Sequence, residues 1–212
     1  IFVSIQGFGQ HLTISTSGET GTSGTNWNIT GNVLQIDSSG TAAINPNVIT
    51  NHLTNTGNLI VDLPFVNVLR NIYINDHINY TGSNARTLIF KSAIDIIIAN
   101  GVSISANNAS LNLVLRSAIA PGYRGVITMN ASTINTNGGH FWAGGGTVDV
   151  SWNSLTVGNE YARTWTSNEI GLSMVGGSLT TNGGNIEMKG MSFNSAINSG
   201  NNIGLKLDNT TI

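Results

Sequence analysis

Cysteine is absent from this 212-residue chain, and only 8% of its residues are charged. The missing thiols exclude disulfides and thiolate metal sites. The formal net charge of −2 and the lack of a basic run give no electrostatic reason to expect a nucleic acid or an anionic membrane as a partner. The longest apolar run, IDIIIA at 94–99, is far shorter than the ~20 residues of a membrane-spanning helix, so we expect no membrane insertion.

Helix signals are also scarce, because no window keeps apolar residues at positions i, i+3, i+4 and i+7. Short segments instead alternate between apolar and polar residues, with Asn, Gly or Ser clusters between them, which is the pattern of strands and turns. The segments are 11–17, 58–63, 71–76, 86–92, 103–117, 126–132, 147–153 and 171–176. We therefore predict an all-β fold, and we interpret Asn-Pro-Asn-Val at 45–48 as a turn.

The chain repeats itself at offsets of 25, 30 and 45 residues. VITMNASTINTNGGHF from Val126 aligns with GLSMVGGSLTTNGGNI from Gly171, Ile104 aligns with Ile134, and RTLIFKSA aligns with NLVLRSA. A unit of roughly 20–25 residues fits these offsets, with 45 as two units, and so short a unit buries its apolar face only by stacking. We predict a parallel β-helix that runs continuously over 1–212, with room for about nine coils.

An antiparallel sandwich or jelly roll is the competing architecture. It would place Asn-Gly in two-residue hairpin turns. The three Asn-Gly pairs, at 100–101, 137–138 and 182–183, instead fall at one place in the repeat, which favours the β-helix.

Three stretches carry a family resemblance: GNLIV, then NIYINDHINYTGSNARTLIFKSAIDIIIANGVSISANNASLNLVLRS, then GVITMNASTINTNGGHFWAGGG. Over roughly residues 50–190 the chain resembles the repeat region of two-partner-secreted exoproteins, the filamentous-haemagglutinin-like and high-molecular-weight adhesins of Gram-negative bacteria. The resemblance implies a right-handed parallel β-helix that an outer-membrane transporter exports to the cell surface or the medium. Since the chain begins at Ile1, we expect it to be a piece of a longer exoprotein.

The doubled Thr-Asn-Gly-Gly is predicted to be a recurring turn, because no helix follows to make a phosphate loop. Its turn and ladder positions are Asn107, Asn137, Gly138, Gly139, Asn182, Gly183 and Gly184. The asparagines at these positions tolerate a left-handed turn and can bond to the next coil. His140 follows one turn, but the four histidines have no metal-ligand spacing, so we expect a structural or surface role and no metal or cofactor.

The predicted binding residues lie in two segments that break the strand pattern. Residues 158–169 are predicted to form a protruding loop that carries Glu160, Tyr161, Arg163 and Trp165, and residues 118–125 a smaller loop that carries Tyr123 and Arg124. Tyr, Trp and Arg dominate binding hot spots. The alternative is that the loop aromatics fold back to cover a β face.

We therefore expect a non-enzymatic adhesin segment that binds a host or cell-surface protein or glycan through loops on a rigid rod. The alternatives are a hemophore-like segment that captures a host haem-carrying protein, and a purely structural spacer. A polysaccharide lyase or glycosidase is a further alternative, which would need two carboxylates in one groove.

Overall fold

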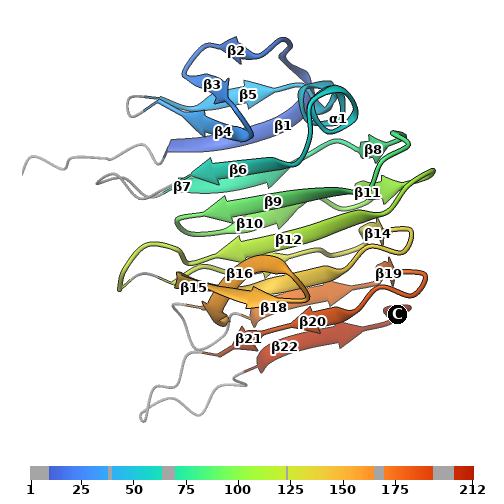
Figure 1. The fold of residues 1–212 in the computed structure, drawn as a ribbon. Helices are drawn as coiled ribbons and strands as arrows, with labels where there is room; N and C mark the ends of the chain where they lie inside the picture. The colour runs from blue at the N-terminus through green and yellow to red at the C-terminus, as the bar shows by residue number, and fades with distance from the viewer. Residues whose placement is uncertain (1–9, 38–39, 64–69, 123, 165–169, 193–202) are drawn as a thin grey trace, which may run out of the picture.

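The described residues of the computed structural model are 10–37, 40–63, 70–122, 124–164, 170–192 and 203–212. They form short strands stacked in parallel layers (Figure 1). The stack is a β-solenoid of about 6 turns, with successive coils about 29 residues apart. This confirms the parallel β-helix, but the predicted unit of 20–25 residues is too short and nine coils are too many.

Three sheets, here named A, B and C, run along the stack. Sheet A contains, in spatial order, β22 (Ile203–Asp208), β18 (Ile170–Val175), β13 (Ile127–Thr128), β10 (Ile96–Ile98), β7 (Arg70–Ile74), β1 (Gln10–Glu19) and β5 (Ala42–Ile44). Sheet B contains β16 (Leu155–Glu160), β15 (Phe141–Trp152), β12 (Leu111–Ser117), β9 (Arg86–Ser92), β6 (Leu59–Leu63), β4 (Val33–Ile36), β3 (Trp27–Thr30) and β2 (Ser23–Gly24), and β20 (Ile186–Met188) also pairs with β15. Sheet C contains β19 (Ser178–Thr180), β14 (Thr133–Asn135), β11 (Ser103–Ala106) and β8 (Ile78–Tyr80), while β17 (Ala162–Arg163) and β21 (Gly190–Met191) form a separate pair.

The core lies inside the coils, where alternate residues of each strand point inward. In sheet B, Leu59, Leu88, Leu113 and Phe141 are direct partners on successive strands, and all four are fully buried. Burying one such side chain contributes about 1.5–3 kcal/mol. Because the same inward position recurs in every coil, the stack has one continuous apolar core rather than separate clusters for each repeat.

The repeat registers at 25 and 30 are confirmed as single coils: Leu88 pairs with Leu113, and Ile104 with Ile134. The offset of 45 was wrongly interpreted as two units. Ile134 pairs directly with Leu179, so these residues lie in adjacent coils. The additional length is an antiparallel hairpin, β15–β16, which is inserted between sheets B and A.

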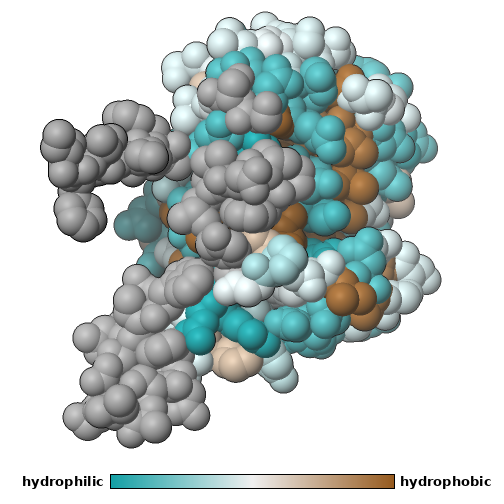
Figure 2. Space-filling view, turned by 90° about the vertical axis from the view of Figure 1, so that its left-hand side faces the viewer, coloured by the Kyte–Doolittle hydropathy of each residue, from teal (hydrophilic) through white to brown (hydrophobic). Residues whose placement is uncertain are grey.

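This hairpin folds back over the outer face of sheet B. It turns at Asn153 and Ser154, which both have positive φ, and it buries Leu155 and Val157. Beneath them lies a row of outward-pointing apolar side chains on successive strands: Ile89, Val114 and Trp142. The hairpin therefore closes a second, smaller core outside the coils. In Figure 2, part of the apolar surface that the grey atoms leave visible forms a vertical row to the right of the centre.

The only helix in the described residues, α1 (Pro46–Asn55), packs against β8 and β1 at the N-terminal end of the stack (Figure 1). The turn predicted at 45–48 is therefore wrong. Asn45 is the N-cap, and its side chain accepts a hydrogen bond from the amide of Asn47, while Pro46 has the fixed φ that suits a first helical position. The helix buries Val48, Ile49 and Leu53 against the end of the core.

A side-chain ladder crosses the coils where the chain enters sheet B. The side-chain oxygen of Asn58 accepts the amide of Thr87 at 2.9 Å, and that of Asn112 accepts the amide of His140 at 2.9 Å. Nδ1 of His140 in turn accepts the amide of Asn185 at 2.9 Å. The histidine thus acts as an acceptor at a position that is asparagine in the preceding coil.

Candidate functional site

The two segments predicted to carry binding residues meet at one place on the surface. The amide of Arg163 donates to the carbonyl of Gly125 at 2.8 Å, and Nη1 of Arg124 donates to the carbonyl of Thr164 at 3.1 Å. Between the segments lies a hollow of about 340 Å³. It is lined by Ala118, Ala120, Pro121, Gly122, Arg124, Thr147, Glu160 and Arg163.

The charged groups of the hollow are two arginines and one glutamate, which gives the lining a net charge of +1. Nη2 of Arg163 pairs with Oε2 of Glu160 at 2.7 Å, and the two side chains are 36% and 39% exposed. Such an exposed pair contributes little to stability, at most about 1 kcal/mol. The Nε of Arg163 is buried without a hydrogen-bond partner in the described part of the chain. The charged lining of the hollow is therefore net positive.

A buried arginine fixes the base of the hairpin beside this hollow. Arg116 is 2% exposed, and its Nε donates to the carbonyl of Gly146 at 2.8 Å. Its Nη1 also donates to the carboxylate of Asp149. This hydrogen bond holds the pKa of Asp149 below its usual value. The point at which β15 leaves sheet B is therefore held by a charge-assisted bond.

The structure brings together three of the six predicted binding residues: Arg124, Glu160 and Arg163. Tyr161 is 46% exposed but does not line the hollow. Tyr123 and Trp165 lie outside the described residues.

The loop predicted at 158–169 is wrong where the structure describes it, because residues 158–160 end β16 and residues 162–163 form β17. Sequence reasoning treated 147–153 as an ordinary strand and so missed Thr147 and the hairpin. The signal was a short polar Asn-Ser pair between two alternating segments, 147–152 and 155–157.

The Thr-Asn-Gly-Gly segments are turns in the structure, as predicted. Asn137 and Asn182 have φ of 48° and 51°, and the glycines that follow them, Gly138 and Gly183, also have positive φ. In each turn the threonine hydroxyl donates to the carbonyl of the second glycine, at 2.5 Å in the first and 2.6 Å in the second. The second glycine is required for stacking: a Cβ on Gly139 would lie 2.3 Å from the carbonyl oxygen of Leu111 in the preceding coil.

The predicted asparagine ladder holds for one of its three asparagines. Nδ2 of Asn107 donates to Oδ1 of Asn79 in the preceding coil at 2.8 Å. Asn137 and Asn182 do not bond to one another through their side chains in the part of the chain that the structure describes. Their left-handed backbone places them in the turn, and the longer ladder runs through Asn58, Asn112 and His140 instead.

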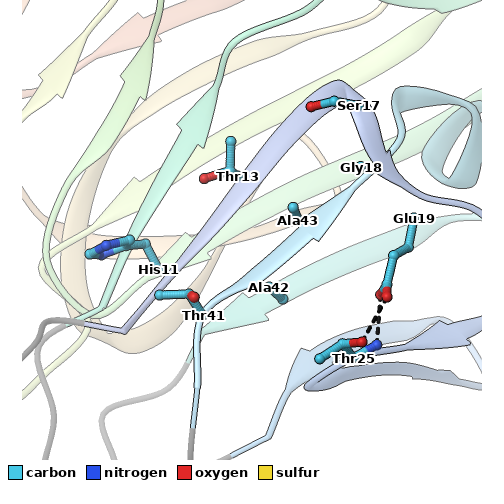
Figure 3. A pocket seen from close by; sticks show the side chains of 9 residues that line it. All are labelled: His11, Thr13, Ser17, Gly18, Glu19, Thr25, Thr41, Ala42 and Ala43. Carbon is cyan, nitrogen blue, oxygen red and sulfur yellow. Dashed lines mark hydrogen bonds between the residues drawn. The ribbon is translucent and has the colours of Figure 1, made fainter.

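A second hollow, of about 450 Å³, lies at the N-terminal end and is lined by β1, β5 and the β2–β3 segment (Figure 3). Its carboxylate, Glu19, accepts three hydrogen bonds: from the amide and hydroxyl of Thr25 at 2.6 and 2.7 Å, and from Nε1 of Trp27 at 2.7 Å. These bonds, the Thr25 hydroxyl first, lower the pKa of Glu19. Glu19 therefore ties the β2–β3 hairpin to β1, and it is the sole carboxylate among the described residues that line this hollow.

Among the described residues, no three His, Cys, Asp or Glu side chains gather as metal ligands would, and no helix is long and apolar enough to cross a membrane. No protein-family model matches the chain, and no curated protein or solved structure is significantly similar to it.

Proposed function

We propose that the chain is a non-enzymatic binding segment of a secreted bacterial surface exoprotein, which contacts a host or cell-surface partner through hairpin β15–β16 and the hollow beside it. One observation carries the proposal: the inserted hairpin and the segments that meet beside it carry arginines, exposed valines and an exposed tyrosine. Val148 is 55% exposed, Val150 39% and Tyr161 46%. Arginine and tyrosine, with an apolar patch beside them, are typical of interface centres.

The stack supports this role because it holds the hairpin rigidly. The hairpin buries Leu155 and Val157 on sheet B, and Arg116 fixes its base. A preorganised surface loses less conformational freedom on binding than a mobile loop does. The family resemblance adds the expectation of export by an outer-membrane transporter and of display on the cell surface.

The test is direct binding of the fluorescently labelled chain to cultured epithelial cells, measured by flow cytometry. We expect saturable binding that falls about tenfold or more in Arg124→Gln, because hot-spot truncations cost about 2 kcal/mol or more. The matched control is Lys206→Gln, which removes one positive charge from β22, a strand that does not line the hollow. Absence of saturable binding, or equal loss in both variants, would refute the proposal.

A further inference from the structure

In the described part of the chain, one edge of β15 has no neighbouring strand beyond the point where the hairpin leaves sheet B. β12 pairs with residues 141–145 of β15 and ends at Ser117. Among the described strands, only the antiparallel β16 pairs with β15 from 149 to 152. Every residue from 147 to 151 is exposed. An exposed strand edge of this kind is a template for pairing with another chain.

The hairpin geometry identifies the backbone groups on this edge. Two-residue turns with positive φ at both positions, here 47° at Asn153 and 63° at Ser154, connect the last hydrogen-bonded pair of an antiparallel ladder. Trp152 and Leu155 are therefore a hydrogen-bonded pair. Since such pairs alternate along the ladder, the N–H and C=O of Asp149 and Ser151 point away from β16.

The arginine-lined hollow adjoins the same edge. Thr147, at the foot of the edge, lines it. Most of the other lining residues come from the segment that follows β12, the strand that pairs with the first part of β15: Ala118, Ala120, Pro121, Gly122 and Arg124. A strand added beside 147–152 would therefore run into a space whose charged lining is Arg124, Arg163 and Glu160.

We propose that the edge of β15 from Thr147 to Trp152 takes an extended, acidic peptide segment of a partner protein as an added strand. Backbone bonds to Asp149 and Ser151 would hold the peptide, and a carboxylate would occupy the hollow at Arg124 and Arg163. Strand addition obtains affinity from main-chain bonds and specificity from the side-chain sites beside them. The net positive lining favours a carboxylate over an amide at the hollow. The inference rests on the proposed function, because it names the kind of partner that the binding segment would recognise.

The test titrates the ¹⁵N-labelled chain with two synthetic peptides, Glu-Thr-Val-Thr-Val-Thr and its Gln counterpart, both acetylated and amidated. We expect the Glu peptide to shift the amide resonances of residues 147–152, to slow hydrogen exchange at Asp149 and Ser151, and to bind about tenfold more tightly than the Gln peptide. Arg124→Gln should remove that preference. Failure of both peptides to shift these resonances at millimolar concentration would overturn the inference, and so would equal affinity for the two peptides.

Ser151 offers a matched pair of variants. Ser151→Pro removes the edge N–H and should weaken binding about tenfold or more, while Ser151→Ala keeps the N–H and should bind as the parent does. Thermal melts of both variants and of the parent chain check that the stack stays folded before their binding is compared. Parental binding by Ser151→Pro would overturn the inference. If the parent chain binds cells but not the peptides, strand addition is wrong and the proposed function stands; if it binds the peptides but not cells, strand addition stands and the cell-surface role is wrong.

Discussion

Gly139 tests how closely the coils are stacked. In Gly139→Ala the new Cβ would lie 2.3 Å from the oxygen and 2.4 Å from the carbonyl carbon of Leu111, both backbone atoms of the preceding coil. The coils must separate to relieve this contact, which strains the bonds from the Leu113 amide to the His140 carbonyl and from the His140 amide to Asn112, both 2.9 Å. Overpacking of about 1–3 kcal/mol and two weakened hydrogen bonds of about 1 kcal/mol each give a loss of about 4 kcal/mol.

The neighbouring Gly138 provides the control, since it has φ of 92° and the nearest atom to a Cβ added there would be Ser110 Cβ at 3.8 Å. Gly138→Ala bears only the cost of a left-handed backbone, about 1–2 kcal/mol. At about 2–4 °C per kcal/mol for a chain of this size, the thermal midpoint should fall by about 8–16 °C in Gly139→Ala and by at most half of that in Gly138→Ala. Circular dichroism melts measure both. Equal midpoints, or a lower midpoint for Gly138→Ala, would refute the stacking argument.

Three further predictions concern the ladder, the N-terminal hairpin and the outer core. His140→Asn should keep the bond to Asn185, because asparagine serves as acceptor in the preceding coil, and should lose only the ring contact with Trp152. His140→Leu should lose both the bond and the ring contact, about 1–2 kcal/mol, and so be less stable than His140→Asn in urea unfolding. The lowered pKa of Glu19 means that its stabilisation is complete above the unfolded pKa of about 4.5 and is lost as pH falls through the lower folded pKa. The protection of the Thr25 amide against hydrogen exchange, relative to the intrinsic rate at each pH, should therefore fall on acidification, and Glu19→Gln should abolish that pH step. Leu155→Ala should cost about 2–3 kcal/mol at the hairpin alone, so that limited proteolysis cuts within 146–160 while the coils stay folded, and a global loss of folding would contradict a separate outer core.

The sequence predicted best which residues point into the core and which of them are equivalent in successive coils. Leu88 with Leu113 and Ile104 with Ile134 were aligned correctly, because identical positions in stacked coils meet the same apolar surroundings. The offset of 45 was misinterpreted, since an alignment gives the distance between equivalent residues but not whether a second coil or an inserted hairpin occupies the interval. α1 was missed because a ten-residue helix rich in Thr and Asn has weak propensity, and its position depends on capping by Asn45 and on tertiary packing.

The candidate site was predicted only in part, for a related reason. Arg124, Glu160 and Arg163 were predicted because their segments break the strand alternation and carry residue types that are common in binding hot spots. Their meeting depends on a contact between Gly125 and Arg163, which are far apart in sequence and belong to adjacent coils. The role of Thr147 and of the strand edge depends on where β12 ends relative to β15, which no local pattern reveals.

The central claim is that the 45-residue interval is one coil with an inserted hairpin, and cysteine cross-linking tests it most directly because the chain has no cysteine of its own. Thr133 and Ser178 are partners on adjacent strands of sheet C, and Ser103 is the partner of Thr133 on its other side. Strands in adjacent coils lie about 4.8 Å apart, within the range that a disulfide spans, whereas two coils separate residues by about 10 Å. Mild oxidation should therefore form a disulfide in Thr133→Cys/Ser178→Cys and not in Ser103→Cys/Ser178→Cys; a disulfide in neither variant, or only in the second, would contradict the coil register.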